Sequence, residues 1–148
     1  MMDDDNAFGY SFLLADGDLV IEDGELLTVT GQANLIQALT LRVLTPYGSD
    51  PFNTTYGLDV TQAFIEPNGV RMIKELIKLN LVRTLGTDPR VSDIRQVLFD
   101  DDPAYLAAHP EVDQRLLRDQ HHRRVWQVEV TIDTVQDRTT TLALKVGV

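Results

Sequence analysis

The sequence GTDPRVSDIRQVLF, residues 86–99, marks the point at which the chain changes from helix to strand. Gly86 follows a long stretch with helical periodicity, as a glycine at a helix C-terminus typically does. Pro89 prevents the helix from resuming and favours an extended conformation for Asp88. The residues that follow, 91–99, predict a strand with an irregular alternation of apolar and polar side chains.

The segments on either side of this switch predict a central helix and a hairpin. Residues 70–85 are apolar nearly all round, so we expect a helix with one narrow face in water, formed by Arg71, Lys74, Glu75 and Lys78. Residues 125–135 alternate cleanly between apolar and polar side chains, which indicates a strand with one buried face. The turn Gln136–Arg138 then leads into residues 139–148, and the two segments predict an antiparallel hairpin.

The N-terminal half predicts a hairpin followed by a helix, a loop and a short helix. Asp23 and Gly24 separate two short apolar runs, and this dipeptide is favoured in tight hairpin turns. Apolar residues at helical spacing follow from residue 31 until Pro46. Prolines, glycines and small polar residues predict an ordered loop over residues 45–59, before a short helix within 58–65.

Together these elements predict an α+β fold with an N-terminal hairpin and two to three helices packed on a small, mainly antiparallel sheet. The length fits a single domain, residues 1–148, whose core can bury roughly 70% of the unfolded chain's surface. Residues 100–123 interrupt the strands with acids, two prolines and two short helical stretches, so we interpret them as an insertion.

Composition and charge exclude several classes of function. The 13 Lys and Arg against 23 Asp and Glu give a net charge of −10, which repels nucleic acid and anionic lipid. The chain has no cysteine, so it has neither disulfides nor a thiolate metal site. The acidic start resembles no signal peptide, and no run of about 18 apolar residues is present. We therefore expect a cytoplasmic protein without membrane insertion.

No motif of catalysis, cofactor binding or metal binding stands out. The adjacent His121 and His122 cannot both face one site on a strand, and His109 lies beside a proline. Four acids, Glu25, Glu66, Glu75 and Glu129, each lie among apolar neighbours in the sequence. The acid runs 3–5 and 100–102 are interpreted as solvated loops and ends. We predict no catalytic, cofactor-binding or metal-binding residue.

The residues Asp88, Pro89 and Arg90 have two interpretations. In the first, Pro89 ends the helix, Asp88 turns the chain and Arg90 pairs with a neighbouring acid. In the second, the planar guanidinium of Arg90 binds carboxylates or carbonyls of a partner chain, and the proline lowers the cost of ordering it. The residues alone leave both open.

Several stretches together resemble the small baseplate wedge proteins of contractile phage tails and related contractile injection systems, a family in which some members carry a lysozyme label. The similar features are the Asn-Leu-x-Gln-Ala helix at 34–38, the Leu-Thr-Pro-x-Gly loop at 44–48 and the Tyr-Gly at 56–57. The Glu-Pro-Asn-Gly at 66–69 is similar too, and Asp88-Pro89-Arg90 stands where the family has Glu-Pro-Arg. The likeness covers roughly residues 18–99.

The resemblance implies a structural baseplate component that joins wedge proteins to the first sheath ring, in several copies within a symmetric, virion-like assembly. It implies that Asp88, Pro89 and Arg90 bind the wedge, that the sheet resembles the strand-exchange domain of sheath subunits, and that a central spike or hub is a further partner. The lysozyme label leaves a peptidoglycan-cleaving enzyme as the alternative.

A sheet edge suits this role because unpaired backbone groups can accept a strand from a partner. Our candidate edge is the final strand, residues 139–148, to which the sheath would add by strand pairing. The competing interpretation is that the N-terminal segment covers this edge.

Overall fold

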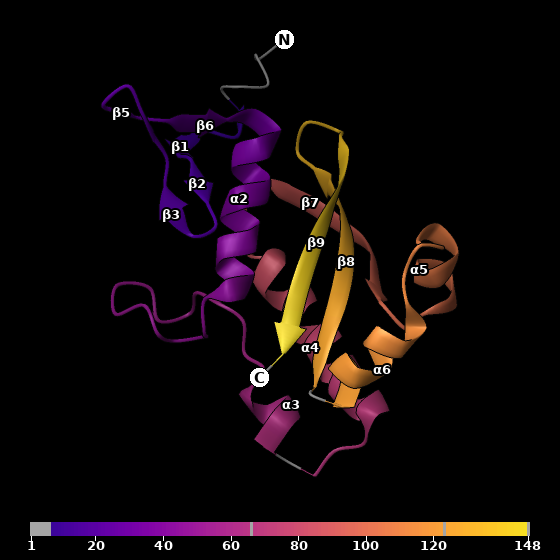
Figure 1. The fold of residues 1–148 in the computed structure, drawn as a ribbon. Coiled ribbons are helices and arrows are strands. Elements are labelled where there is room, and N and C mark those ends of the chain that lie inside the picture. The colour runs from indigo at the N-terminus through magenta and orange to yellow at the C-terminus, as the bar shows by residue number, and fades with distance from the viewer. Residues whose placement is uncertain (1–6, 66, 123, 148) are drawn as a thin grey trace. The chain divides into compact units, whose positions relative to one another are not determined.

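The computed structural model describes residues 7–65, 67–122 and 124–147. The chain forms two compact units, residues 1–41 and 42–148, and the boundary falls inside helix α2. Each unit is described in turn. The architecture is α+β with small antiparallel sheets (Figure 1), which confirms the predicted fold class.

The first unit is a β-arm followed by a helix. Three antiparallel strand pairs succeed one another in the arm, and α2 spans Gly31–Leu44. The pairs are β1 (Tyr10–Phe12) with β6 (Thr28–Thr30), β2 (Leu14–Ala15) with β3 (Asp18–Leu19), and β4 (Ile21–Glu22) with β5 (Glu25–Leu26). Asp23 and Gly24 both have positive φ, as a two-residue hairpin turn requires, so the predicted hairpin is confirmed.

Two amide side chains of α2 hold the arm. Asn34 donates to the carbonyl of Phe8 at 2.8 Å and accepts a hydrogen bond from the Ser11 hydroxyl. Gln37 donates to the carbonyl of Phe12 at 2.8 Å and accepts from the backbone N–H of Leu14 at 3.0 Å. Because each amide has both a donor and an acceptor group, one side chain can replace the missing backbone partners of an edge strand. This gives a physical role to the Asn-Leu-x-Gln-Ala motif.

The second unit is built around the three-stranded antiparallel sheet β7-β8-β9, with β8 at its centre. The strands are β7 (Val91–Phe99), β8 (Val125–Thr134) and β9 (Thr139–Gly147). Burial alternates strictly along β8 and β9. The buried face carries Trp126, Val128, Val130, Ile132, Leu142, Leu144 and Val146. The predicted hairpin is confirmed for the described residues; Val148 lies outside them.

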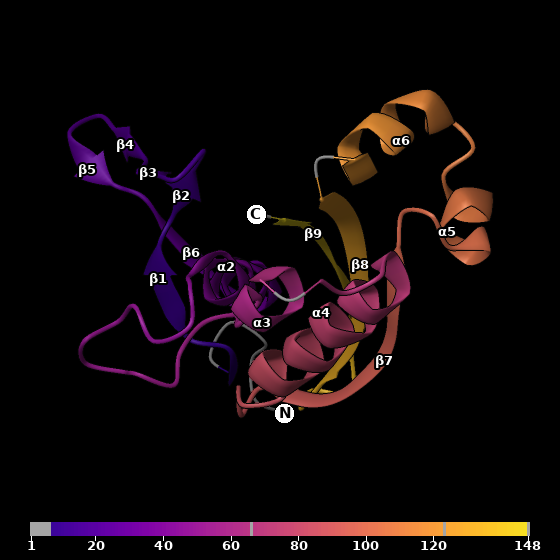
Figure 2. The same ribbon diagram turned by 90° about the horizontal axis from the view of Figure 1, so that it is seen from below.

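Helices cover this sheet on both sides. α4 (Val70–Leu85) lies along the buried face, and α3 (Thr61–Ile65) packs beside it (Figures 1 and 2). α4 buries Ile73, Ile77, Leu81 and Leu85 on the side that meets the sheet. α5 (Pro103–Ala108) and α6 (Gln114–His122) lie on the other side, as Figure 2 shows. The segment 100–123 therefore forms two short helices between β7 and β8, as its sequence predicts.

Gly86 ends α4, as the sequence predicts, with φ −68° and ψ −13°. The prediction for the exposed side of α4 needs correction. This side is wider and more apolar than the predicted narrow polar stripe, since Met72, Leu79 and Val82 are exposed. Lys74, by contrast, is largely covered because it binds Asp101 and Asp102.

The irregular alternation in 91–99 has a structural cause. The pairing of β7 with β8 shifts register between Val91 and Asp93 and again between Ile94 and Gln96. Ser92 and Arg95 are the extra residues at these β-bulges. After each extra residue, the side chains that would have faced one side of the sheet face the other.

Gly57 is required by a close backbone approach. Its φ is +109°, and a Cβ at this position would lie 2.4 Å from the carbonyl oxygen of Thr45. Gly57→Ala should lower the free energy of unfolding by about 1–3 kcal/mol, because it adds backbone strain and a steric clash. Urea unfolding measures the change.

Gly69→Ala is the matched control. Gly69 has φ −67°, and no heavy atom lies within 4 Å of a Cβ built there. Its stability should stay within about 1 kcal/mol of the parent chain. Equal effects of the two substitutions would contradict the inferred close approach at Gly57.

Candidate partner-binding site

Asp88 and Arg90 pair with each other at the turn between α4 and β7. Arg90 donates from Nε to Asp88 Oδ1 at 2.9 Å and from Nη2 to Asp88 Oδ2 at 2.8 Å. The backbone N–H of Arg90 also donates to Asp88 Oδ1, at 3.0 Å. Two parallel bonds between a guanidinium and a carboxylate fix both side chains in one plane. The pairing of Arg90 with a neighbouring acid, as in the first interpretation, is therefore present.

Asp88, Pro89 and Arg90 differ in burial, so they differ in what a partner chain can contact. Asp88 is 4% exposed, Pro89 is exposed and Arg90 is half-buried. A partner chain can reach the proline ring and the exposed part of the Arg90 side chain, whereas the Asp88 side chain is almost fully covered. Asp88 is thus a positioning residue for Arg90, and partner binding by residues 88–90 stays a prediction.

The backbone of the turn is tied to the sheet. The N–H of Asp88 donates to Leu85 at 3.2 Å, and the N–H of Val91 donates to Asp88 at 3.1 Å. The carbonyl of Arg90 accepts from the N–H of Val135, in the turn between β8 and β9, at 3.0 Å. The corner therefore has a fixed position on the second unit; we call residues 86–90 the 86–90 corner.

The charges at this corner are matched. Burial raises the pKa of the Asp88 carboxyl, but hydrogen bonds from Arg90 and the charges of Arg90 and Arg42 outweigh burial and leave that pKa below its ordinary value. The hydrogen bonds to Asp88 in turn raise the pKa of Arg90, against the effect of burial. The pair therefore stays ionised at neutral pH.

The loop of residues 45–59 is anchored beside the corner. The Thr84 hydroxyl donates to the carbonyl of Gly57 at 2.7 Å, and Arg42 Nη1 donates to the Thr87 hydroxyl at 2.8 Å. The Arg42 guanidinium also stacks 4.5 Å from the centre of the Tyr56 ring. The Leu-Thr-Pro-x-Gly loop, the Tyr-Gly pair and Asp88-Pro89-Arg90, three of the motifs that carry the resemblance, thus meet in one region.

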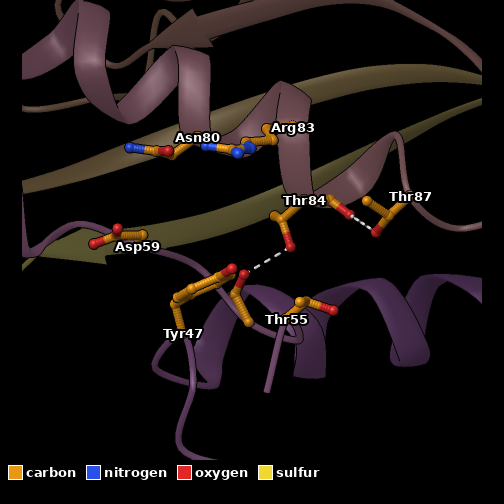
Figure 3. Close-up of a pocket in the computed structure, with 8 residues that line it drawn as sticks. Tyr47, Thr55, Asp59, Asn80, Arg83, Thr84 and Thr87 are labelled. Atoms are coloured by element: carbon orange, nitrogen blue, oxygen red, sulfur yellow. Dashed lines mark hydrogen bonds between the residues drawn. The ribbon is translucent and has the colours of Figure 1, made fainter. Parts of the chain in front are cut away.

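A cleft of about 230 Å³ opens next to this region (Figure 3). Asn80, Arg83 and Thr84 of α4 line one side, and residues of the 45–59 loop line the other (Figure 3). The full lining is Tyr47, Thr55, Gly57, Asp59, Asn80, Arg83, Thr84 and Thr87. The lining residues carry hydroxyl, amide and charged groups, while carbon atoms make up most of the lining surface, so the cleft suits a protein segment of mixed character.

The free edge of β9 is the second candidate surface. The N–H of Thr134 donates to the carbonyl of Arg138 at 2.8 Å, so even-numbered residues of β8 and β9 exchange the hydrogen bonds of this antiparallel pair. The backbone groups of Thr139, Thr141, Ala143, Lys145 and Gly147 then point away from β8. Within the described residues no further strand pairs with β9.

The acids 100–102, expected to be solvated, differ from one another: Asp101 is exposed, Asp102 is half-buried and Asp100 is buried, while residues 3–5 lie outside the described residues. Asp100 is fully buried, and its carboxylate accepts the N–H of Gln127 at 3.0 Å, which extends the β7–β8 pairing. Asp101 binds Lys74 at 2.6 Å, and Asp102 accepts the N–H of Phe99 at 2.8 Å. These carboxylates are used to hold the chain after β7.

His109 is bound to carboxylates as well, so it is not a solvated loop residue. Its Nε2 lies 2.5 Å from Glu129 on the outer face of β8, and its Nδ1 lies 3.3 Å from Glu111. The hydrogen bond with Glu129 raises the pKa of His109 against the effect of desolvation, and Glu111 adds to this. This contact fastens the segment after α5 to the sheet.

Chemical groups for catalysis or metal binding do not converge at the corner. In the ranges 7–65, 67–122 and 124–147, no three His, Cys, Asp or Glu side chains are arranged to hold a metal ion. The cleft contains a single carboxylate, Asp59. Glu66, one of the four acids with apolar neighbours, lies outside the described residues. None of the helices in the described part of the chain has the length and apolar character that crossing a membrane requires.

The 45–59 loop is the part of the site that the residues alone did not predict. Its glycines and prolines indicated an ordered loop, but nothing local showed which helix it would meet. The available signal was a pair of hydroxyl side chains, Thr84 in the last turn of the helix and Thr87 just beyond it, and this signal does not identify the segment that they meet.

The Asp88 carboxylate should make stability depend on pH. A carboxyl with a lowered pKa in the folded chain stabilises the fold above its unfolded pKa of about 4, and this contribution is lost as the pH falls through the folded pKa. Asp88→Asn should therefore lower the free energy of unfolding by about 1–3 kcal/mol at pH 7. The difference from the parent chain should shrink steadily below about pH 4.

Urea unfolding at a series of pH values measures this difference. Asp119→Asn is the control, because Asp119 is exposed on α6, and it should change stability by no more than about 0.5 kcal/mol at any pH. A gap between Asp88→Asn and the parent chain that is the same at pH 3 and pH 7 would refute the charge-based account.

In comparisons with known proteins, no protein-family model, no curated protein and no solved structure matched the chain. The grounds for a function are therefore the geometry of the 86–90 corner, the free edge of β9 and the sequence motifs that meet at the corner.

Proposed function

We propose that this protein is a structural component of the baseplate of a contractile tail or injection system and links wedge proteins to the first sheath ring. The observation that carries the proposal is that three of the motifs similar to the baseplate family lie together at the 86–90 corner, where the Asp88–Arg90 pair lies beside an anchored loop and a cleft. A rigid, prebuilt corner lowers the entropy cost of binding a partner.

In this proposal the wedge contacts Pro89 and the exposed part of Arg90, and Asp88 holds the guanidinium in place. The Arg90 side chain is 25% exposed, so part of it remains within reach of a partner chain while it bonds Asp88. A polar or acidic helix end of the wedge fits the adjoining cleft, because Asn80 and Arg83 present donors there.

The sheath would bind at the other surface, by adding a strand to the outer edge of β9. A hollow of about 210 Å³ lies at the end of this edge, between Lys145–Gly147 and the residues around Pro46 and Leu58. It gives an incoming chain a second wall beyond the hydrogen-bonding edge. Unpaired backbone groups supply affinity in this mode of recognition, and side-chain contacts supply specificity.

The alternative function, cleavage of peptidoglycan, gains no support from a specific observation. Such an enzyme needs two carboxyl groups about 5–9 Å apart across the substrate, one of them with a raised pKa. Among the residues that line the cleft beside the corner, Asp59 is the one with a carboxyl group.

Arg90→Ala should reduce binding to the wedge at least tenfold, because the partner loses its contact with the guanidinium and the corner loses the bidentate bond between Arg90 and Asp88. The test is expression together with the products of the neighbouring reading frames, followed by purification of the complex. Arg95→Ala is a matched control, since Arg95 also bonds an aspartate, Asp133, but on an exposed part of β7. Arg90→Lys keeps the charge without the fork and should also fail.

Circular dichroism must show that Arg90→Ala is folded. Should Arg90→Ala and Arg95→Ala assemble equally well with wedge proteins, the 86–90 corner is a turn and nothing more, and the proposed wedge contact is wrong.

Ala143→Pro tests the edge. Residue 143 is exposed on β9 and its N–H points away from β8, so proline removes an outward donor without removing a bond to β8. Attachment of sheath should be lost while wedge binding persists. Ala143→Ser retains the N–H and should behave like the parent chain. Normal sheath attachment by folded Ala143→Pro would show that sheath does not use this edge.

A further inference from the structure

The charges of the chain are divided very unevenly between its two units. All 13 Lys and Arg lie in residues 42–148, and none lies in residues 1–41. The first unit nevertheless holds eight acids: Asp3, Asp4, Asp5, Asp16, Asp18, Glu22, Asp23 and Glu25. The first unit thus carries most of the net charge of −10. A charge separation of this kind steers partners of opposite charge toward one part of a molecule.

The same arm exposes large apolar side chains. Tyr10 is 79% exposed and Ile21 is 64% exposed, and Phe12, Leu19 and Leu26 are exposed as well. Single exposed apolar residues are ordinary, but five within 17 residues of one small unit form a local concentration. We call residues 10–26 the acidic-apolar arm.

The geometry of the arm keeps these side chains outward. Ser11 turns toward α2, where its hydroxyl bonds Asn34. Since neighbouring residues of a strand point to opposite faces, Tyr10 and Phe12 face away from α2. In the next ribbon, Ile21 and Leu26 are directly opposite each other across β4 and β5. They form an exposed cross-strand apolar pair.

The adjacent cross-strand pair consists of two like charges. Glu22 lies opposite Glu25, at the tip closed by Asp23 and Gly24. Like charges directly opposite each other destabilise a strand pair. The tip therefore has three carboxylates close together, and no Lys or Arg of its own unit can neutralise them. A bound cationic group would relieve this repulsion.

We propose that the acidic-apolar arm is a second docking surface, which binds a basic protein segment that carries apolar side chains among its lysines or arginines. Ile21 and Leu26 lie on one face of the β4–β5 ribbon and Glu22 and Glu25 on the other, and both pairs are exposed next to the tip. The long stems of these cations can cover the apolar pair while their charged ends reach around the tip to the carboxylates. Nucleic acid and anionic lipid are repelled by the same charge. The inference does not rest on the proposed baseplate function.

The arm is suited to this role because it is held before the partner arrives. The amides of Asn34 and Gln37 fasten its base, and two Asp-Gly turns with positive φ, at 16–17 and 23–24, close its ribbons. A preformed ribbon loses little conformational freedom on binding.

The test uses the full chain and a defined probe. The probe is a synthetic amphipathic helical peptide of leucine and lysine, and its counterpart replaces every lysine by glutamate. Backbone amide resonances of the labelled chain report where each peptide binds. We expect the lysine peptide to shift amides of the acidic-apolar arm, with an affinity that falls as salt is added. The glutamate peptide should leave these amides unchanged.

Variants separate specific docking from simple charge attraction. Glu22→Lys with Glu25→Lys should weaken binding of the lysine peptide at least tenfold, and Ile21→Ser with Leu26→Ser should weaken it at least fivefold. Glu75→Lys with Asp119→Lys makes the same change of charge on exposed residues of the second unit, and Phe52→Ser removes an apolar side chain that is 99% exposed. These controls should bind like the parent chain.

Retained amide resonances of Asn34 and Gln37 show that each variant keeps the arm in place. If the two charge reversals together unfold the arm, the single variant Glu25→Lys replaces them, and it should also weaken binding of the lysine peptide. The proposal is overturned if the lysine peptide shifts mainly residues 42–147, if the control variants lose as much affinity, or if the serine variants bind as tightly as the parent. Association of the chain with itself through the arm, without any peptide, would overturn it as well.

Discussion

The bidentate contact between Arg90 and Asp88 governs the point where α4 gives way to β7. Pro89 prevents the helix from resuming after Gly86, but a proline alone does not determine the direction in which the chain continues. The carboxylate of Asp88 does so, because it binds both the backbone N–H and the side chain of Arg90. The carbonyl of Arg90 then joins the turn between β8 and β9. The start of the sheet is thereby placed against the end of its covering helix, and Arg90 becomes the exposed member of a rigid pair.

The polar side chains of the second unit serve the same purpose elsewhere. Asp100 takes the place of a backbone carbonyl at the end of β7, and His109 joins the segment after α5 to Glu129 on β8. Thr84 bonds the carbonyl of Gly57, whose backbone approaches too closely for any side chain. Each of these groups holds a turn or a loop of the second unit in place.

The sequence predicts most of the fold because its strongest signals are local. The alternation at 125–135, the Asp23-Gly24 turn and Pro46 act over a few residues, and the elements appear where these signals place them. The failures concern tertiary contacts. Periodicity identified the apolar sides of α4 but not which of them the sheet would cover, so the exposure of Met72 and Leu79 was missed. Asp100 was assigned to solvent because acids are rarely buried, and its burial depends on Gln127, which is distant in sequence. At the site, the pairing of Asp88 with Arg90 was one of two open interpretations, whereas the anchoring of the 45–59 loop was not foreseeable without the structure.

The two amides that hold the arm, Asn34 and Gln37, stand on one helix, α2, and this limits how such chains can vary in length. A helix advances by 1.5 Å and turns by roughly 100° for each residue. One residue inserted or deleted between Asn34 and Gln37 would therefore rotate one amide relative to the other by more than a quarter of a revolution about the helix axis. Both amides could then no longer bond the arm at the same time. Loops tolerate such insertions and deletions, so related chains should vary in length at the hairpin tips and keep the spacing between Asn34 and Gln37 constant.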